Sequence, residues 1–386
     1  MIMPATLCRC HVARIATAAS MAFAVPATLV AQGAITMQGF GYPGGQLSTR
    51  ALGAGGALAD FDANSPLNPA ALVVANRASV YAQYDPEFRS VRGVTGNSSG
   101  VTARFPVLAV SGRYGRATFG FSFSNLLDRT WVNTYTDTES VGGRVVQSRV
   151  TAQSAGGISD VRAAAAWTFS DKVHVGAGVH LFPGENRTLL GRDFADSLQI
   201  GSFTQANTYN FSGTALSVGI LAIPLSHLNV AVAARFGGTL RMRLADTAQV
   251  GAASVPGRVS VSAAYDGYAG SLIAVRYARE QWSALRGLGS AGLSVTDAAD
   301  LSGGVEFAGP KLSGLASAVR LGFRTRDLPF GVGAARASES ALTAGIGLPF
   351  GSGRGAGDLT VARAHRVSGG ASETGWILSF GFSIKP

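Results

Sequence analysis

The chain has 386 residues, of which 47% are hydrophobic and 14% are charged, and its formal net charge is +10. About 25% charged residues is usual for a soluble globular domain, so this composition argues against one. The basic side chains are almost all arginines and are scattered along the chain, which argues against a nucleic-acid-binding protein.

Residues 1–31 have the features of a secretory signal peptide. Arg9 and Arg14 precede an apolar stretch that closes on small residues at Ala31, so cleavage is expected before Gln32. The alternative is an uncleaved anchor, for which the stretch is short. Both cysteines of the chain lie in this segment, so the mature chain is expected to have no disulfide, thiolate nucleophile or cysteine metal ligand.

Residues 32–76 show no alternation of apolar and polar side chains. A short helix is expected near residues 48–52, and a glycine-rich turn follows at 53–60. Asn68 and Pro69 together start another turn. This stretch therefore forms a compact segment ahead of the first strand.

From about residue 118 onward, apolar residues recur at every second position in one segment after another. Successive side chains of a strand point to opposite faces, so each segment predicts a strand with one apolar face and one small, polar or charged face. The clearest segments are 118–124, 172–181, 228–236, 258–265, 319–326, 342–348 and 376–384.

These strands predict an all-β fold, a transmembrane antiparallel β-barrel. A soluble β-sandwich gives the same alternation, but the non-apolar face here is rich in Gly, Ser and Arg, as a polar lumen permits. The apolar faces often end in aromatic residues, as at the two membrane interfaces of a barrel. The last strand, 376–384, has this pattern almost to the C-terminus.

Three further local predictions concern the connections. Residues 215–234 are apolar enough to suggest a membrane helix, but Pro224 and the polar residues after it indicate two strands joined by a turn. The polar stretch 183–205 is expected to be a surface loop. Gly pairs such as Gly237-Gly238 and Gly369-Gly370 are expected to be hairpin turns.

The run STRALGAGGALADFDANSPLNPAAL, residues 48–72, resembles the N-terminal signature of the outer-membrane long-chain fatty acid transporter (FadL) family. Tyr84-Asp85-Pro86 and GLPFG at 347–351 fit the same resemblance. That superfamily also includes barrels for aromatic-hydrocarbon uptake and for type IX secretion.

The resemblance implies a barrel of about fourteen strands with the N-terminal segment folded inside it as a plug. It divides the chain into a signal peptide at 1–31, a plug at 32–76 and a barrel at 77–386. It also implies that substrate binds beside the plug and leaves sideways through an opening in the wall. The residues that it assigns to this plug and ligand-binding segment are Gly53, Gly55, Gly56, Asp60, Asp62, Asn68 and Pro69.

Few residues suggest other chemistry. Asp60, Asp62 and Asn64 match the start of a calcium loop, but Ser65 stands where Gly is required, so no metal site is expected. His174 and His180 share one face of a strand without an identifiable third metal ligand. No nucleotide fingerprint or hydrolase motif is present, so we expect neither a cofactor nor an enzyme.

The resulting hypothesis is a bacterial outer-membrane barrel for passive uptake of long-chain fatty acids or other hydrophobic small molecules. Arg320 and Arg324 are candidate lumen partners for a carboxylate headgroup. Outer-membrane lipid and lipopolysaccharide are the other expected partners, nucleic acid is not, and the chain is expected to be a monomer. The alternative is a non-transporting barrel of the same superfamily that serves a secretion system or binds a partner protein.

Overall fold

The computed structural model describes residues 35–93, 96–141, 143–195, 201–245, 249–268, 270–288, 294–312 and 315–385. The expected signal peptide lies outside these ranges. The described helices are all short, and none of them is long and apolar enough to span a bilayer. They are η2 (Ile35–Met37), α2 (Thr49–Gly53), η3 (Ala59–Phe61), η4 (Pro69–Val74), η5 (Trp282–Leu288) and η6 (Gly351–Gly353).

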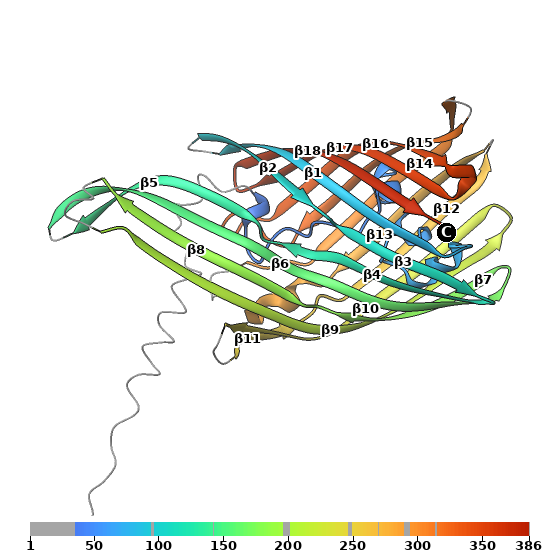
Figure 1. Cartoon of the computed structure of the whole chain (residues 1–386), viewed down its shortest axis with the longest axis horizontal. Helices are drawn as coiled ribbons and strands as arrows, with labels where there is room; N and C mark the ends of the chain where they lie inside the picture. Colours follow the sequence, from blue (N-terminus) through green and yellow to red (C-terminus); the bar gives the residue numbers. More distant parts are fainter. Residues whose placement is uncertain are drawn as a thin grey trace, which may run out of the picture.

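The strands form one antiparallel sheet that closes on itself where β1 pairs with β18 (Figure 1). They are β1 (Ser79–Gly93), β2 (Gly96–Arg104), β3 (Val107–Tyr114), β4 (Ala117–Asp128), β5 (Trp131–Val141), β6 (Arg144–Ser170), β7 (Val173–Leu181), β8 (Gly184–Phe194), β9 (Phe203–Leu225), β10 (Leu228–Leu244), β11 (Gln249–Ser254), β12 (Arg258–Tyr268), β13 (Ser271–Glu280), β14 (Ala298–Leu312), β15 (Leu315–Leu328), β16 (Ala337–Phe350), β17 (Gly355–Ser368) and β18 (Ala371–Ile384).

Four of the wall strands are each interrupted once, so these segments make a closed barrel of 14 strands, as predicted. β2 continues as β3, β4 as β5, β7 as β8 and β11 as β12, because each pair lies along a common neighbour. Pro106, Pro183 and Pro256 lie in three of the four breaks. Proline has no N–H for a ladder, which explains why pairing is interrupted there.

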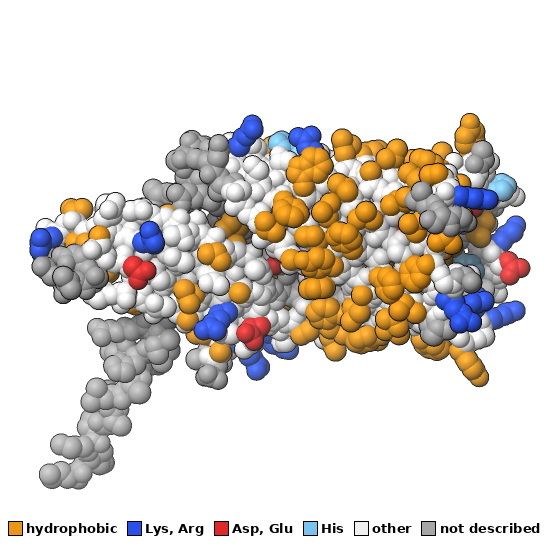
Figure 2. All heavy atoms as spheres, turned by 45° about the horizontal axis from the view of Figure 1, so that its top comes forward, with side chains coloured by type: hydrophobic (Ala, Val, Ile, Leu, Met, Phe, Trp, Pro, Cys, Tyr) orange, Lys and Arg blue, Asp and Glu red, His pale blue; other side chains and the backbone are white. Residues whose placement is uncertain are grey.

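The outer wall carries a continuous apolar band. Phe119 and Phe121 are each 54% exposed, although a soluble protein would bury such side chains. In Figure 2 hydrophobic side chains gather over the half of the barrel that carries the shortest turns, and the other half is mostly polar. Trp376, Phe380 and Phe382 of the last strand face outward as predicted. In this half of the barrel the described sheet has no open edge, so its backbone groups are paired within the wall. A paired backbone and an apolar outer face are what a lipid environment requires.

The two ends of the barrel differ. The hairpins β3–β4, β6–β7 and β9–β10 turn within a few residues, and the C-terminal strand ends beside them. Longer connections and a projecting lobe of β5, β6, β8 and β9 form the opposite end (Figure 1). Short turns face the periplasm in outer-membrane barrels, so we orient the short-turn end toward the periplasm and the long-loop end toward the exterior.

The structure confirms some of the local predictions about the connections and contradicts others. Residues 215–234 form the β9–β10 hairpin, with the turn at Ser226 and His227, so the prediction of two strands is confirmed. The prediction of a loop over 183–205 was wrong, because most of it is β8 and the start of β9. β8 lies in the projecting lobe, where neither face needs an apolar row. Its sequence therefore lacks the pattern that identifies the other strands.

Gly237 and Gly238 were also predicted wrongly, since they lie inside β10 at a bulge and not at a turn. A Cβ at Gly237 would approach the carbonyl oxygen of Val255 to 1.7 Å. Gly237 therefore allows close approach of Val255, which lies in the break between β11 and β12. Gly369 and Gly370 do form a hairpin turn, and both have a positive φ.

We expect Phe121→Arg to destabilise the barrel by about 2–4 kcal/mol, because it places a cation on the lipid face of β4. Val145→Arg is the matched control, since Val145 is 78% exposed in the polar lobe. Urea titration of protein folded into vesicles, followed by tryptophan fluorescence, measures both. Equal stability of the two variants would contradict the position of the apolar band.

Candidate functional site

The segment from Ile35 to Ala75 lies inside the barrel and fills it between opposite walls. α2 packs against β15–β18, and η4 packs against β4, β6, β7 and β9. Figure 1 shows these short blue elements enclosed by the strands. We call residues 35–75 the plug.

Two polar side chains begin the plug helices. Ser48 caps α2, where its Oγ accepts from the N–H of Ala51 at 3.0 Å. Asn68 caps η4 by accepting from the N–H of Ala70 at 2.9 Å, and Pro69 occupies the first helical turn. Both residue types satisfy N–H groups that a helix start leaves unpaired. The Asn68 amide also donates to the carbonyl oxygen of Asp60 at 2.9 Å, and this bond joins η3 to the start of η4.

The plug glycines allow its backbone to touch the wall. Gly55 has φ +67° and a Cβ there would lie 2.4 Å from the carbonyl oxygen of Phe323. Gly322 on the wall has a matching role, because its Cβ would lie 2.2 Å from the carbonyl carbon of Ala54. Gly53, at the end of α2, accepts through its carbonyl from Thr343 at 2.9 Å. Gly56 also has a positive φ, +96°, and shares the turn.

The two plug carboxylates have separate partners. Asp60 accepts from Ser262 at 2.6 Å and from Arg276 at 3.0 Å. Burial alone would raise the pKa of Asp60, but Arg276 and these hydrogen bonds hold it below its usual range. Asp62 accepts instead from Ser48, within the plug. In the described residues no group of three or more His, Cys, Asp or Glu side chains is placed to hold a metal ion.

Tyr42 is the most heavily bonded plug residue. Three guanidinium groups lie around its ring, with centroid distances of 4.6 Å for Arg366, 5.0 Å for Arg326 and 5.3 Å for Arg104. Its hydroxyl accepts from Arg326 and Arg366 and donates to Glu339 at 2.5 Å. Burial raises the pKa of Tyr42, so the hydroxyl remains a donor. We call this set the Tyr42 cluster.

Carboxylates balance the arginines of the Tyr42 cluster. Arg366, which is fully buried, makes ion pairs of 2.6 Å with Glu87, Glu339 and Glu373. Arg104 bridges Glu87 and Asp128 at 2.5 Å each. These side chains were not singled out from the sequence, because their pairing joins strands far apart in sequence and has no sequence signal.

The two predicted lumen arginines are already paired. Arg320 makes ion pairs of 2.5 Å with Glu306 and Asp358, and Arg324 makes one of 2.5 Å with Asp300. Neither lies in the Tyr42 cluster. A ligand carboxylate at either position would have to compete with a protein carboxylate.

Asp160, His180 and Ser217 form a hydrogen-bonded chain, with distances of 2.7 Å and 2.8 Å on the two sides of the imidazole. The spacing is that of a hydrolytic triad, but Ser217 is only 2% exposed, so no ester reaches its Oγ in this conformation. Asp160 also accepts from Gln46 of the plug at 2.7 Å, so the chain holds the plug against β6, β7 and β9. His174 bonds to Thr168 instead, so the two histidines have different partners.

The barrel wall is not paired along its whole height. The β3–β4 ladder ends at Val107 and Ser124, with one further bond from the N–H of Asn125 to the carbonyl of Pro106. Beyond it, in the part of the chain that the structure describes, β2 pairs only with β1 and β5 only with β6. Figure 1 shows β5 running away from β2 toward the long-loop end. We call this gap the wall opening.

At the wall opening the edge of β4 is not paired with β2 in the described residues, and the plug pairs with that edge instead. Both backbone groups of Asp128 bond to Tyr42, at 2.8 Å and 2.9 Å, and Gly45 forms a second bridge with Asn125. Extending the β3–β4 register would place Ala103 of β2 opposite Asp128. The plug therefore takes the position of β2 at the base of the wall opening.

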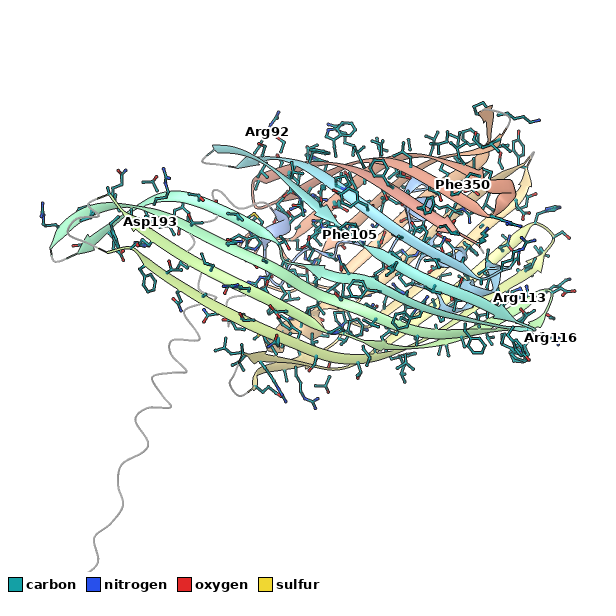
Figure 3. The ribbon with its side chains drawn as sticks, viewed as in Figure 1. Arg92, Phe105, Arg113, Arg116, Asp193 and Phe350 are labelled. Atoms are coloured by element: carbon teal, nitrogen blue, oxygen red, sulfur yellow. The ribbon has the colours of Figure 1, made fainter. Side chains whose placement is uncertain are left out.

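A cavity of about 410 Å³ lies at the wall opening. Phe105 and Phe123 line it from the outer face, and Leu127 and Ile158 line it from within. Figure 3 shows Phe105 on the wall between the two ends of the barrel. The same cavity reaches the Arg104–Asp128 ion pair and Glu185, so its lining is both apolar and charged.

Leu127 and Ile158 also belong to a buried apolar cluster inside the lumen, at the level of the strand breaks. Phe182 and Val255 lie in two of those breaks and point inward, because each interruption shifts the alternation of the strand. The cluster comprises Phe40, Leu126, Leu127, Ile158, Phe182, Tyr209, Phe211, Ala215, Leu240, Met242, Val255, Trp282, Leu285, Leu288, Val295, Ala298 and Phe330. We call it the lumen cluster.

No family model matches the sequence. No curated protein is similar to it in sequence either. Solved structures are similar in fold at low identity. A Pseudomonas aeruginosa FadL homologue has a TM-score of 0.60 at 12% identity, over 88% of this chain and 98% of that one. The P. putida toluene transporter TodX has a TM-score of 0.57 at 12% identity, over 91% and 99%. The CymD monoaromatic hydrocarbon channel has 0.56 at 14%, over 88% and 97%.

Closed barrel, apolar band and internal plug together define a β-barrel protein of the bacterial outer membrane. More particularly, the chain has the fold of the FadL-like outer-membrane channels, as its N-terminal signature predicted.

We expect Tyr42→Phe to loosen the plug by about 1–3 kcal/mol, because two buried guanidinium groups and Glu339 lose one hydrogen-bond partner each. Trypsin cleavage after Arg50, followed across a urea titration, reports when the plug leaves the lumen. Tyr84→Phe is the control, since Tyr84 faces outward, and its effect should stay within about 0.5 kcal/mol. Identical protection of both variants and the wild type would show that the Tyr42 cluster does not hold the plug.

Proposed function

We propose that the protein is a passive channel that admits hydrophobic or amphipathic small molecules across the outer membrane. The main observation in support is the continuity of the lumen cluster with the wall opening, through Leu127 and Ile158. An open water-filled pore would have a polar lining along its axis. Here the plug fills the lumen, and buried apolar side chains extend from the lumen to the wall opening.

In this mechanism, substrate enters from the long-loop end and partitions into the lumen cluster. Its affinity comes from burial of apolar surface, at about 25 cal/mol per Å². Trp282 and the other η5 side chains, with the aromatic residues Phe182 and Phe211, are the surfaces that it contacts. No energy source is required, because transfer from water to an apolar site is favourable by itself.

Substrate then leaves through the wall opening toward the lipid. Phe105 and Phe123 face the membrane at this point, so an apolar molecule remains in apolar surroundings as it passes. Movement of Tyr42 away from Asp128 would change the width of the opening, because the plug supplies the strand partner of Asp128. The Tyr42 cluster thus connects the position of the plug to the size of the exit.

Three kinds of substrate fit this proposal: long-chain fatty acids, monoaromatic hydrocarbons and other small apolar molecules. The structural neighbours named above include toluene and monoaromatic hydrocarbon channels as well as a FadL homologue. For a fatty acid, Arg320 and Arg324 remain proposed headgroup partners, in competition with Glu306, Asp358 and Asp300. The plug residues predicted from the signature remain proposed determinants of binding.

We expect Ala103→Trp to reduce uptake of a hydrophobic probe to near the background of vesicles without protein, because Ala103 lines the wall opening. Ala165→Trp is the matched control, since Ala165 faces outward from β6 on the fully paired part of the wall. Fluorescent fatty acid entering vesicles and toluene entering cells both measure uptake. Unchanged uptake by a folded Ala103→Trp variant would rule out the wall opening as the exit.

Calorimetric titration of the detergent-solubilised protein with oleate and, separately, with toluene distinguishes transport from the alternative function. Saturable binding of either ligand, near one site per chain, supports the channel. A folded protein that binds neither, and that purifies with a stoichiometric partner, supports the secretion or partner-binding role instead.

A further inference from the structure

Exposed cationic side chains follow one another along part of the short-turn rim. They lie in turns or at strand ends, and each is exposed to solvent. Figure 3 shows Arg113 and Arg116 at this end, and Figure 2 shows Lys and Arg side chains gathered there. The set, which we call the basic arc, is Arg77, Arg113, Arg116, Lys172, Arg354 and Lys385.

Pairing between the strands shows that the basic arc is continuous. The N–H of Lys385 donates to the carbonyl of Arg354 at 2.6 Å. β18 then pairs with β1, and β1 with β3, which place Arg77 between Lys385 and Arg113. On the other side, the N–H of Thr168 donates to the carbonyl of Arg116 at 3.0 Å, beside the turn that holds Lys172. The cations therefore lie on neighbouring strands of one side of the barrel.

Carboxylates do not balance this charge as they do elsewhere. In the described turns of the basic arc, Asp171 is the one acidic side chain. At the long-loop end, by contrast, Arg192 makes ion pairs with both Asp137 and Glu139. A row of like charges is unfavourable for a folded protein unless a partner of opposite charge compensates it.

Exposed aromatic side chains alternate with these cations. Tyr114, between Arg113 and Arg116, is 83% exposed, and Phe169, close to Lys172, is 60% exposed. Phe350, close to Arg354, stacks on Phe382 of the apolar band with ring centroids 5.2 Å apart. Aromatic residues at the edge of an apolar band mark the boundary between hydrocarbon and headgroups. The basic arc therefore lies at the depth of lipid headgroups and not in bulk solvent.

We propose that the basic arc binds the phosphate headgroups of anionic phospholipids in the periplasmic leaflet. A row of cations is complementary in charge to a row of anions. The neighbouring aromatic side chains lie at the depth of the headgroups, so we identify those anions as lipid phosphates. A soluble acidic protein would contact the cations without needing exposed Tyr114 and Phe169 beside them. Arg113 lies near the end of β3 and Arg116 in the turn before β4, and the other ends of these strands border the wall opening, so the bound lipids lie at the periplasmic ends of the same strands.

The test uses vesicles of phosphatidylcholine that contain either brominated phosphatidylglycerol or brominated phosphatidylcholine. Trp167 is the reporter, because it is 46% exposed on the outer wall, pairs with Ala117 beside Arg116, and lies on β6 shortly before the turn that holds Lys172. All proteins carry Trp376→Phe, so that Trp167 gives most of the lipid-accessible signal. Bromine quenches a tryptophan only at short range, so the ratio of the two quenching efficiencies reports which lipid occupies the basic arc.

We expect stronger quenching by phosphatidylglycerol than by phosphatidylcholine, and a smaller preference at high salt. Arg113→Gln, Arg116→Gln and Lys172→Gln together should lower the preference by at least about fivefold, which is the effect expected from the loss of one cation near an anionic surface. The charge-matched control, Arg187→Gln in the lobe with Arg241→Gln and Arg243→Gln at the long-loop end of β10, should keep it. Equal quenching by the two lipids in the parent protein, or an equal preference in both triple variants, would overturn the proposal.

Discussion

Backbone hydrogen bonding in hydrocarbon is the constraint on which the whole structure depends. A strand in lipid has no water to pair its N–H and C=O groups, so the sheet must close. Through the apolar band it does close, from β1 around to β18. Above the band this constraint relaxes, and there the proline breaks, the unpaired edges of β2 and β5 and the projecting lobe occur. The wall opening lies at this transition, where a gap in the ladder can be tolerated.

The plug makes this gap a defined feature. Tyr42 satisfies the backbone of Asp128 in place of β2, and the same residue is surrounded by Arg326 and Arg366 from the far wall. Buried charges are costly unless they are paired, and removing one member of such a network leaves the others unpaired. A network of this kind favours one plug position over its neighbours, which a purely apolar contact would not do.

Sequence reasoning recovered the fold because a lipid-facing strand must alternate, and the predicted rows in β4, β7, β12 and β18 all became wall strands. It failed for β8, which lies outside the band, and for Gly237, where bulge and turn require the same residue type. The short helix expected near residues 48–52 is α2 (Thr49–Gly53), which Ser48 caps. The Tyr42 cluster was not, because Glu87, Glu339 and Arg366 meet only after strands from both ends of the chain have paired. The wall opening could not be predicted from the sequence either, because whether a strand edge is paired depends on the positions of the neighbouring strands.

The bonds between the plug and the last strands also determine the order in which the molecule can assemble. Thr36 bonds to Glu373 and Thr49 to Ser379, so residues near the beginning of the described chain take partners from β18. During synthesis and export the plug emerges before any of these strands exists. It must stay unfolded or loosely held until β18 arrives and pairs with β1. The event that closes the barrel is then also the event that encloses the plug, and a chain that lost its last strand would lose both.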